Sequence, residues 1–188
     1  AAFSLPEFVT AAWLEDFGPK RTRQICFACN RKPSLYLRTN TLRKAPSRLL
    51  DELLKEDIQA ELIEDTPLIR LTSPADITKL PGFDRGHFTV QDYSAYLPVA
   101  LLAPPAGAKI LDLCAAPGTK TTQLAEITSD NARIIATDPD SNRLKMIDQN
   151  TARLGHKNIS VLSFQQWENK AADLAPFDYI LLDVPCSN

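Results

Sequence analysis

The sequence contains no run of apolar residues long enough to cross a bilayer, and no basic segment followed by an apolar one at its start. A membrane-spanning helix needs about 20 mainly apolar residues, and a secretion signal needs the basic-then-apolar pattern. We therefore expect a cytoplasmic protein with no membrane partner. Apolar residues make up 44% and charged residues 23% of the 188 residues, which excludes a disordered chain.

Cysteines are few and do not form a disulfide framework. The chain has four of them, Cys26, Cys29, Cys114 and Cys186, and we expect reduced thiols. Cys26 and Cys29 form a C-x-x-C pair, but a zinc site needs a second pair of ligands at metal spacing, and none follows. We therefore predict no metal and a pair that packs as small apolar side chains on one helix face; zinc is the alternative.

An overall excess of positive charge is also missing, since the net charge is -2. One stretch nevertheless has no acidic residue, and its basic residues are Arg31, Lys32, Arg38, Arg43, Lys44 and Arg48. A local basic surface of this kind attracts phosphate groups even in a mildly acidic protein. The stretch predicts a nucleic-acid contact, and an ordinary solvated face is the alternative.

The first two of three segments differ in their patterns. Residues 1–32 are expected to be helical, because Ser4 and Glu7 have capping-box spacing and Gly18-Pro19 ends a first helix. A second short helix is expected from Ile25 to Asn30. Residues 33–85 predict a small α/β unit. Its expected elements are strands near 35–39, 58–63 and 67–71, and a helix that begins at Pro46 with Leu49, Leu50, Leu53 and Leu54 on one face.

Residues 86–188 alternate strand and helix, which predicts a parallel sheet. A short extended piece is expected at 88–90. The four expected strands are 109–113, 133–137, 159–163 and 178–183, and the expected helices are 94–102, 119–127 and 142–154. A doubly wound sheet normally continues past its fourth strand, so the apolar strand 178–183 would be left as an exposed edge. We therefore expect this segment to be part of a longer domain.

The turn between Ile110 and Thr121 is the most informative motif. An apolar strand leads into a tight turn of small residues and then into a helix. Small side chains let a ligand approach the backbone, and the helix N-terminus offers unpaired N–H groups. Gly118 is the turn's one glycine, which excludes the G-x-G-x-x-G of a NAD site and the P-loop. The turn therefore predicts a ligand site of another type.

Two acidic residues follow later strands of the predicted sheet. Asp138 ends the strand after the turn, where an acid can bond both hydroxyls of a ribose; capping the 142–154 helix is the alternative. Asp183 and Cys186 leave the last strand at its carboxyl end, where open α/β sheets bind ligands. An ordinary strand exit with a buried cysteine is the alternative there.

Together, Asp112–Thr121 and Asp183–Ser187 resemble the Nol1/Nop2/Sun family of RNA 5-methylcytosine methyltransferases. Members of that family carry a D-x-C-A-A-P-G-G-K-T loop and a D-x-P-C-S turn. Leu80–Phe83, Phe88–Asp92 and Leu35–Thr41 are also similar to the family. The resemblance runs from about residue 6 to the end, and it is greatest to the bacterial Sun-type (RsmB-like) branch, which acts on 16S ribosomal RNA.

The resemblance implies an α/β fold with a Rossmann-like methyltransferase core, C-terminally truncated, that binds S-adenosyl-L-methionine (SAM). A small α/β domain similar to an RNA-recognition motif would precede it, after an N-terminal helical segment. The implied domains are 1–32, 33–85 and 86–188. The implied partner is RNA, most of all ribosomal RNA, contacted by Arg31, Lys32, Arg38, Arg43 and Lys44.

The resemblance also implies roles for individual residues. SAM would be lined by Cys114, Ala115, Ala116, Pro117, Gly118, Thr119 and Lys120. Asp138 would hold the ribose hydroxyls, Asp183 would lie between cofactor and cytosine, and Cys186 would help to release the methylated RNA. The sequence departs from the family twice. Thr119 replaces the second glycine of the loop, and Phe164–Trp167 stands where an acid near adenine is expected, so Gln165 is the candidate adenine contact.

The nucleophile of this family is a cysteine in a later T-C-S turn, which this sequence does not contain. We therefore expect the 188 residues alone to bind SAM weakly or not at all, and not to methylate RNA. Three alternatives stay open. Cys186 is itself the nucleophile, as the Pro-Cys cysteine is in related DNA methylases; the chain is a NAD-dependent dehydrogenase; or it is an RNA-binding module without catalysis.

Overall fold

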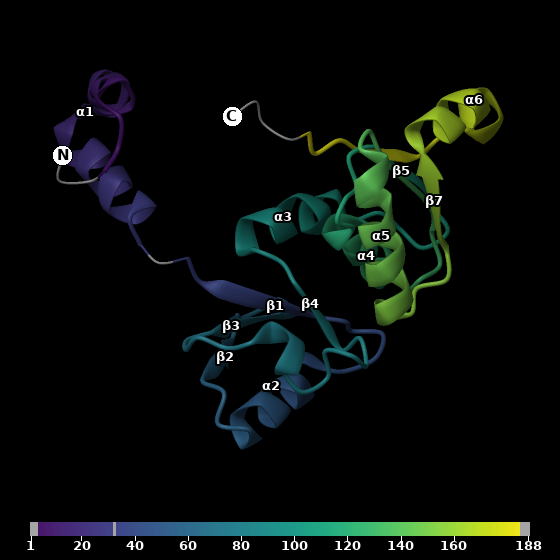
Figure 1. Cartoon of the computed structure of the whole chain (residues 1–188), viewed down its shortest axis with the longest axis horizontal. Coiled ribbons are helices and arrows are strands. Elements are labelled where there is room, and N and C mark those ends of the chain that lie inside the picture. The colour runs from purple at the N-terminus through teal and green to yellow at the C-terminus, as the bar shows by residue number, and fades with distance from the viewer. Residues whose placement is uncertain (1–3, 32, 185–188) are drawn as a thin grey trace. The chain divides into compact units, whose positions relative to one another are not determined.

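The structure is a computed structural model that describes residues 4–31 and 33–184. The chain divides into two compact units, residues 1–34 and residues 35–188. The first unit contains the helix α1 (Glu7–Cys29). The second contains two four-stranded sheets with their helices (Figure 1). No helix in the described part of the chain is long and apolar enough to span a membrane.

Helix α1 consists of two stretches that meet at Gly18. This glycine has φ +70° and ψ 169°, and Pro19 follows it, because a residue before proline is driven out of the helical region. The predicted break is confirmed, but the second stretch starts directly after it. The predicted capping box is wrong, since Pro6 occupies the N-cap position and no side chain caps the helix. The predicted packing of the C-x-x-C pair is also wrong, because Cys26 is buried and Cys29 is exposed.

The smaller sheet of the second unit is antiparallel, with the order β2-β3-β1-β4. Its strands are β1 (Leu35–Thr39), β2 (Ala60–Leu62), β3 (Leu68–Leu71) and β4 (Phe88–Val90). Helix α2 (Pro46–Lys55) begins at its proline as predicted, because the fixed φ of proline suits the first helical position. The short 3-10 helix η1 (Ile77–Lys79) follows β3.

One face of the small sheet packs against α2 through apolar side chains. The buried members of this core are Leu37, Leu49, Leu53, Ile69, Leu71, Leu80 and Phe88. Leu54, predicted on the same stripe, is 46% exposed. The apolar stripe of α2 is therefore narrower than the sequence pattern predicted.

Strand β4 belongs to the small sheet, where Leu37 of β1 lies opposite Val90. Residues 88–90, which the sequence pattern assigned to the third segment, pair with the small sheet instead. A three-residue strand carries no signal of its partner in its own sequence. Helix α3 (Tyr93–Leu102) starts almost at once, with the Asp92 carboxylate accepting from Ser94 N. The division of the chain into three domains stays a prediction.

The second sheet is parallel, as predicted, with the order β7-β6-β5-β8. Its strands are β5 (Lys109–Asp112), β6 (Arg133–Asp138), β7 (Ile159–Ser163) and β8 (Tyr179–Leu181). Helices α4 (Thr119–Ile127), α5 (Ser141–Leu154) and α6 (Phe164–Leu174) connect them. Strands β6 and β7 lie on one side of β5, and β8 lies on its other side. The carboxyl ends of β5 and β8 therefore form a switch point, where open α/β sheets bind ligands.

Candidate cofactor-binding site

The turn that follows β5 runs along the switch point and is held by the neighbouring strands. Leu113 N donates to Leu181 O at 3.1 Å, and Ala115 N donates to Thr137 O at 3.0 Å. The side chain of Arg143 donates to Ala116 O at 2.8 Å, and that of Asn150 to Pro117 O at 2.9 Å. Helix α5 thus fixes the carbonyl groups of the turn, which leaves a rigid backbone surface for a ligand.

Gly118 ends the turn and requires the absence of a side chain. Its φ is +93°, and a Cβ there would lie 3.2 Å from Ile147 Cγ2. Thr119, which stands where the family has a second glycine, is the first residue of α4 and is helical. This substitution therefore does not strain the backbone. The first N–H groups of α4 have no acceptor within the helix, so they are available to a ligand.

Asp138 lies at the end of β6 and is 3% exposed. Its carboxylate accepts from Ala116 N at 3.1 Å and from Asp140 N at 3.0 Å. The N-cap of α5 is Asp140, which accepts from Asn142 N. The alternative in which Asp138 caps this helix is therefore wrong. A carboxylate accepts up to about four hydrogen bonds, so Asp138 retains capacity for hydroxyl groups.

Asp183 faces the start of α4 from the end of β8. Its carboxylate forms an ion pair with the ammonium group of Lys120, joining two residues on either side of the switch point. Asp183 is the more exposed partner, at 59% against 16% for Lys120. Cys186, three residues further, lies outside the described residues. The structure thus brings together the turn, Asp138, Lys120 and Asp183.

Asp112 is a buried acid of this site to which the sequence analysis gave no role. It is 1% exposed and accepts a hydrogen bond from Thr121 Oγ1 at 2.7 Å. Burial raises the pKa of Asp112 to about 6, against the opposing effects of Thr121 and Lys120. The signal that could have identified it is its position as the last residue of the strand before the turn.

Cys114 lies in the turn itself, between the acidic residues. Burial, and then the charges of Asp138 and Asp112, raise the pKa of its thiol above the ordinary value. A thiol with a raised pKa is not a nucleophile at neutral pH. Cys114 is therefore suited to line a ligand and not to attack one.

Gln165 lies at the carboxyl end of β7, in the first turn of α6, and its side chain is exposed. No helix was predicted here from the sequence. The missed signal is a capping box, in which Ser163 accepts from Gln166 N while the Gln166 side chain accepts from Ser163 N. Gln165 remains the candidate for the adenine contact.

The basic stretch does not form the continuous surface that the sequence predicted. Arg38 is fully buried, so its predicted contact with RNA is wrong. Arg43 is exposed but donates to Arg85 O, and Lys44 pairs with Glu52. Arg31 is exposed in the other unit, and Lys32 lies outside the described residues. The residues that remain available for a phosphate contact are therefore fewer than predicted.

A parallel sheet with a small-residue turn after its first strand, an acid after the next and a carboxylate at the switch point defines the Rossmann-like class of methyltransferase folds. Two family models match this chain. The model "16S rRNA methyltransferase RsmB/F" matches residues 99–188, and the RsmF/B-like ferredoxin-like domain matches residues 5–78. The chain belongs to the RsmB/F methyltransferase family.

Curated relatives agree with this assignment. The chain is 43% identical over 171 residues to ribosomal RNA small subunit methyltransferase B of Photorhabdus laumondii, covering 90% of the chain and 39% of that protein. The same enzyme of Sodalis glossinidius is 41% identical over 184 residues, covering 97% of the chain and 41% of that protein. The chain thus spans about two fifths of the length of these relatives.

Solved structures share the fold. A methyltransferase homologue from Pyrococcus horikoshii superimposes with a TM-score of 0.85 at 29% identity, over 99% of the chain and 61% of that protein. NSun6 from the same organism, solved with SFG, gives a TM-score of 0.86 at 21% identity, over 99% of the chain and 72% of that protein. The second likeness is one of fold alone.

Proposed function

We propose that the protein carrying this chain transfers a methyl group from SAM to C5 of cytosine in ribosomal RNA. This chain contributes the cofactor-binding sheet and the small α/β domain. The observation that supports the proposal most is the convergence of the turn after β5, Asp138 and the Lys120–Asp183 pair at one switch point. Relatives of the chain carry the name of a ribosomal RNA methyltransferase.

The residues of the site fit SAM. The closely packed turn from Cys114 to Lys120 offers backbone to a ligand, and Asp138 retains lone pairs for the ribose hydroxyls. Gln165 is placed at the strand end where an adenine contact is expected. A fold relative was solved with SFG, an analogue of SAM. When bound, SAM supplies an electrophilic methyl group.

Cytosine C5 is a weak nucleophile, so a thiolate must first add to C6 and make C5 enamine-like. In this proposal Asp183, exposed beside the turn, faces the ring near N3. After methyl transfer a base removes the C5 proton and the thiolate leaves C6, and Cys186 assists this release. The attacking cysteine, which the family resemblance assigns to a T-C-S turn, is not among these 188 residues. Burial and the neighbouring carboxylates raise the pKa of the Cys114 thiol, which disfavours the thiolate that would compete for the methyl group. The target base must be unstacked, which favours single-stranded RNA.

Titration of the chain with S-adenosylhomocysteine and, separately, with NAD tests the cofactor. Because the turn and its acids are in place, we expect weak but measurable binding of S-adenosylhomocysteine and none of NAD. Asp138→Ala should weaken that binding by about tenfold or more, because it removes a buried acceptor. Binding of NAD, or equal affinity of the variant, would contradict the proposal.

Transfer of labelled methyl groups to 16S ribosomal RNA tests the chemistry. We expect no transfer by these 188 residues, since the proposed nucleophile is not among them. Robust transfer would contradict that assignment and make Cys186 the nucleophile. Cys186→Ala would then abolish the transfer.

A further inference from the structure

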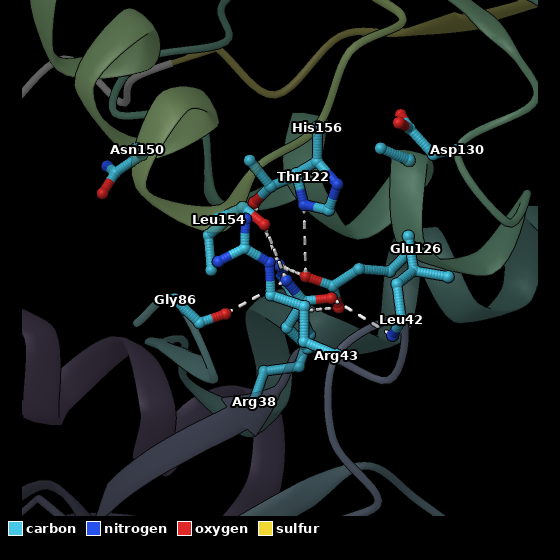
Figure 2. Close-up of polar contacts among 12 residues, drawn as sticks. Arg38, Leu42, Arg43, Gly86, Thr122, Glu126, Asp130, Asn150, Leu154 and His156 are labelled. Carbon is cyan, nitrogen blue, oxygen red and sulfur yellow. Dashed lines mark hydrogen bonds and ion pairs between the residues drawn. The ribbon is translucent and has the colours of Figure 1, made fainter. Parts of the chain in front are cut away.

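A fully buried arginine connects the small sheet to the helix that starts at the cofactor turn. Arg38 lies in β1 and is 0% exposed, and its guanidinium points at α4 (Figure 2). Nε and Nη2 donate to the two carboxylate oxygens of Glu126, each at 2.9 Å. Nη2 also donates to Thr122 Oγ1 at 2.9 Å. Arg38 therefore binds α4 through hydrogen bonds to the side chains of two residues on successive turns.

The remaining donors of the guanidinium complete the arrangement. Nη1 donates to Thr119 O at 2.6 Å and to Gln91 Oε1. An arginine has five N–H donors, and all five have an acceptor here. Since burying a charge is costly unless it is paired and fully bonded, this arrangement specifies one position of α4 relative to the small sheet.

Two of these contacts lead directly into the cofactor turn. Thr119 is the first residue of α4, and its carbonyl group is one acceptor of Arg38. Thr122, the other, donates its hydroxyl to Gly118 O at 2.8 Å, and its backbone N–H donates to the same oxygen at 2.9 Å. The guanidinium thus fixes the first turn of α4 and, through Thr122, the glycine that ends the cofactor turn.

Gln91 extends the same network to α3. Its Nε2 donates to Gln123 Oε1 at 2.8 Å and to Ala95 O at 3.2 Å. Gln123 in turn donates to Tyr96 O at 2.9 Å. The side chains of both glutamines are buried, so the polar contacts made by Arg38 also set how α3 and α4 pack.

A second group of contacts joins the end of β1 to helix α5 without touching the cofactor turn. Asn40 donates at 3.0 Å to the carbonyl oxygen of Leu154, the last residue of α5, and at 3.1 Å to that of Gly86, in the loop before β4. Asn40 is fully buried, like Arg38. It therefore offers a matched control, because its loss weakens the same junction but leaves the first turn of α4 intact.

We propose that Arg38 is a positioning residue for the cofactor, acting through Thr119, Thr122 and Gly118 from within the small domain. The inference rests on the proposed function, since it assigns the ligand of the turn to SAM. It replaces the predicted role of Arg38 in RNA binding. It also makes the small domain a determinant of cofactor affinity.

Lysine cannot replace arginine in this position. Its ammonium group is a point charge with three donors and lacks the planar fork that holds two carboxylate oxygens and a carbonyl group together. Arg38→Lys therefore keeps the charge beside Glu126 while releasing acceptors at the start of α4. Asn40→Ala removes three hydrogen bonds, to Gly86 O, Leu154 O and Leu42 N, and leaves the acceptors at the start of α4 bonded to Arg38.

The test is an NMR titration of the chain with S-adenosylhomocysteine, at a temperature where circular dichroism shows every variant folded. We expect Arg38→Lys to weaken binding by about tenfold, as for the loss of one or two charge-assisted hydrogen bonds, and Asn40→Ala to change it by less than about twofold. A purely structural role would lower the melting temperature of both variants and leave the affinity of the folded protein unchanged. That result would overturn the inference.

Amide hydrogen exchange in the free protein is the second readout. The Thr122 N–H, bonded to Gly118 O, should exchange faster in Arg38→Lys than in Asn40→Ala. Equal exchange would overturn the inference even if the wild-type chain bound no ligand, whereas absent wild-type binding alone would count against the proposed function. If Arg38→Lys does not fold, Thr122→Val removes only the hydroxyl link, and wild-type affinity in that variant would overturn the inference.

Discussion

One face of the small sheet is buried by apolar packing, and the other is buried by hydrogen bonding to a helix. One face packs Leu37, Ile69 and Phe88 against the leucines of α2. From the other face, Arg38 reaches α4 through hydrogen bonds that use every donor of its guanidinium. Apolar burial is non-directional, whereas bonds to fixed acceptors specify an orientation. The apolar face therefore stabilises the sheet, and the polar face sets where α4 and its cofactor turn lie.

The largest effect is expected on the polar face. Glu126→Leu would leave the Arg38 charge buried and unpaired, at a cost of about 3–5 kcal/mol in the free energy of unfolding. Urea unfolding followed by circular dichroism measures this cost. The double variant Arg38→Met with Glu126→Leu should recover most of it, because no charge is then buried. A cost below about 1 kcal/mol for the single variant would contradict the account of this face.

On the apolar face, Leu53→Ala should lower the free energy of unfolding by about 2–5 kcal/mol, because it removes fully buried methyl groups and leaves a cavity. Its effect on ligand affinity separates the two faces. The folded variant should bind S-adenosylhomocysteine like the wild type, since Leu53 has no part in orienting α4. Comparable losses of affinity in Leu53→Ala and Arg38→Lys would remove the distinction between the faces.

The buried acid at the end of β5 should make stability depend on pH. The folded pKa of Asp112, about 6, lies above the ordinary value of 3.8. The folded state therefore binds more protons between these values, and stability falls as the pH rises from about 4 to 6. Over that range the free energy of unfolding of Asp112→Asn should rise by up to about 3 kcal/mol relative to that of the wild type, because the amide does not ionise. Unfolding free energies of both proteins at pH 4 and pH 7 measure this difference, and a constant difference would contradict the assignment.

A smaller effect is expected at the glycine that Arg38 fixes through Thr122. The Cβ added by Gly118→Ala would lie 3.2 Å from Ile147 Cγ2, and the alanine would have to adopt a left-handed backbone conformation. The substitution should lower the free energy of unfolding by about 2–3 kcal/mol. Gly107→Ala is the matched control, because its φ is +84° and nothing lies within 4 Å of the added Cβ. The control should cost about 1 kcal/mol. Thermal unfolding compares the two, and equal costs would show that the packing of the turn against α5 contributes little.

Much of the parallel sheet could be predicted because its strands are apolar runs separated by helical patterns. The Ile110–Thr121 motif, Asp138 and Asp183 were predicted from their positions at strand ends, where the topology brings them together. Arg38 could not be predicted in the same way. Its charge and its basic neighbours are typical of a surface, and its acceptors on α4 lie more than eighty residues away in the sequence.

Short elements were the other source of error. Strand β4 has three residues, so its sequence does not reveal that β1 is its partner. Helix α6 begins with a capping box of Ser163 and Gln166, but Ser163 was expected to end a strand and Phe164–Trp167 was interpreted only as standing in place of a missing acid. The strand β4 was thus predicted without its partner β1. The capping box of α6 was present in the sequence but was interpreted as a cofactor contact.

The most direct test of the central claim is the map of amide shifts that S-adenosylhomocysteine produces in the labelled chain. We expect shifts around Asp138 and at residues 113–121, which include Lys120, the ion-pair partner of Asp183. We expect these shifts to disappear at the same ligand concentration in Asp138→Ala. Shifts confined to other surfaces, or a map unchanged by Asp138→Ala, would contradict the claim that the cofactor binds at the switch point between β5 and β8.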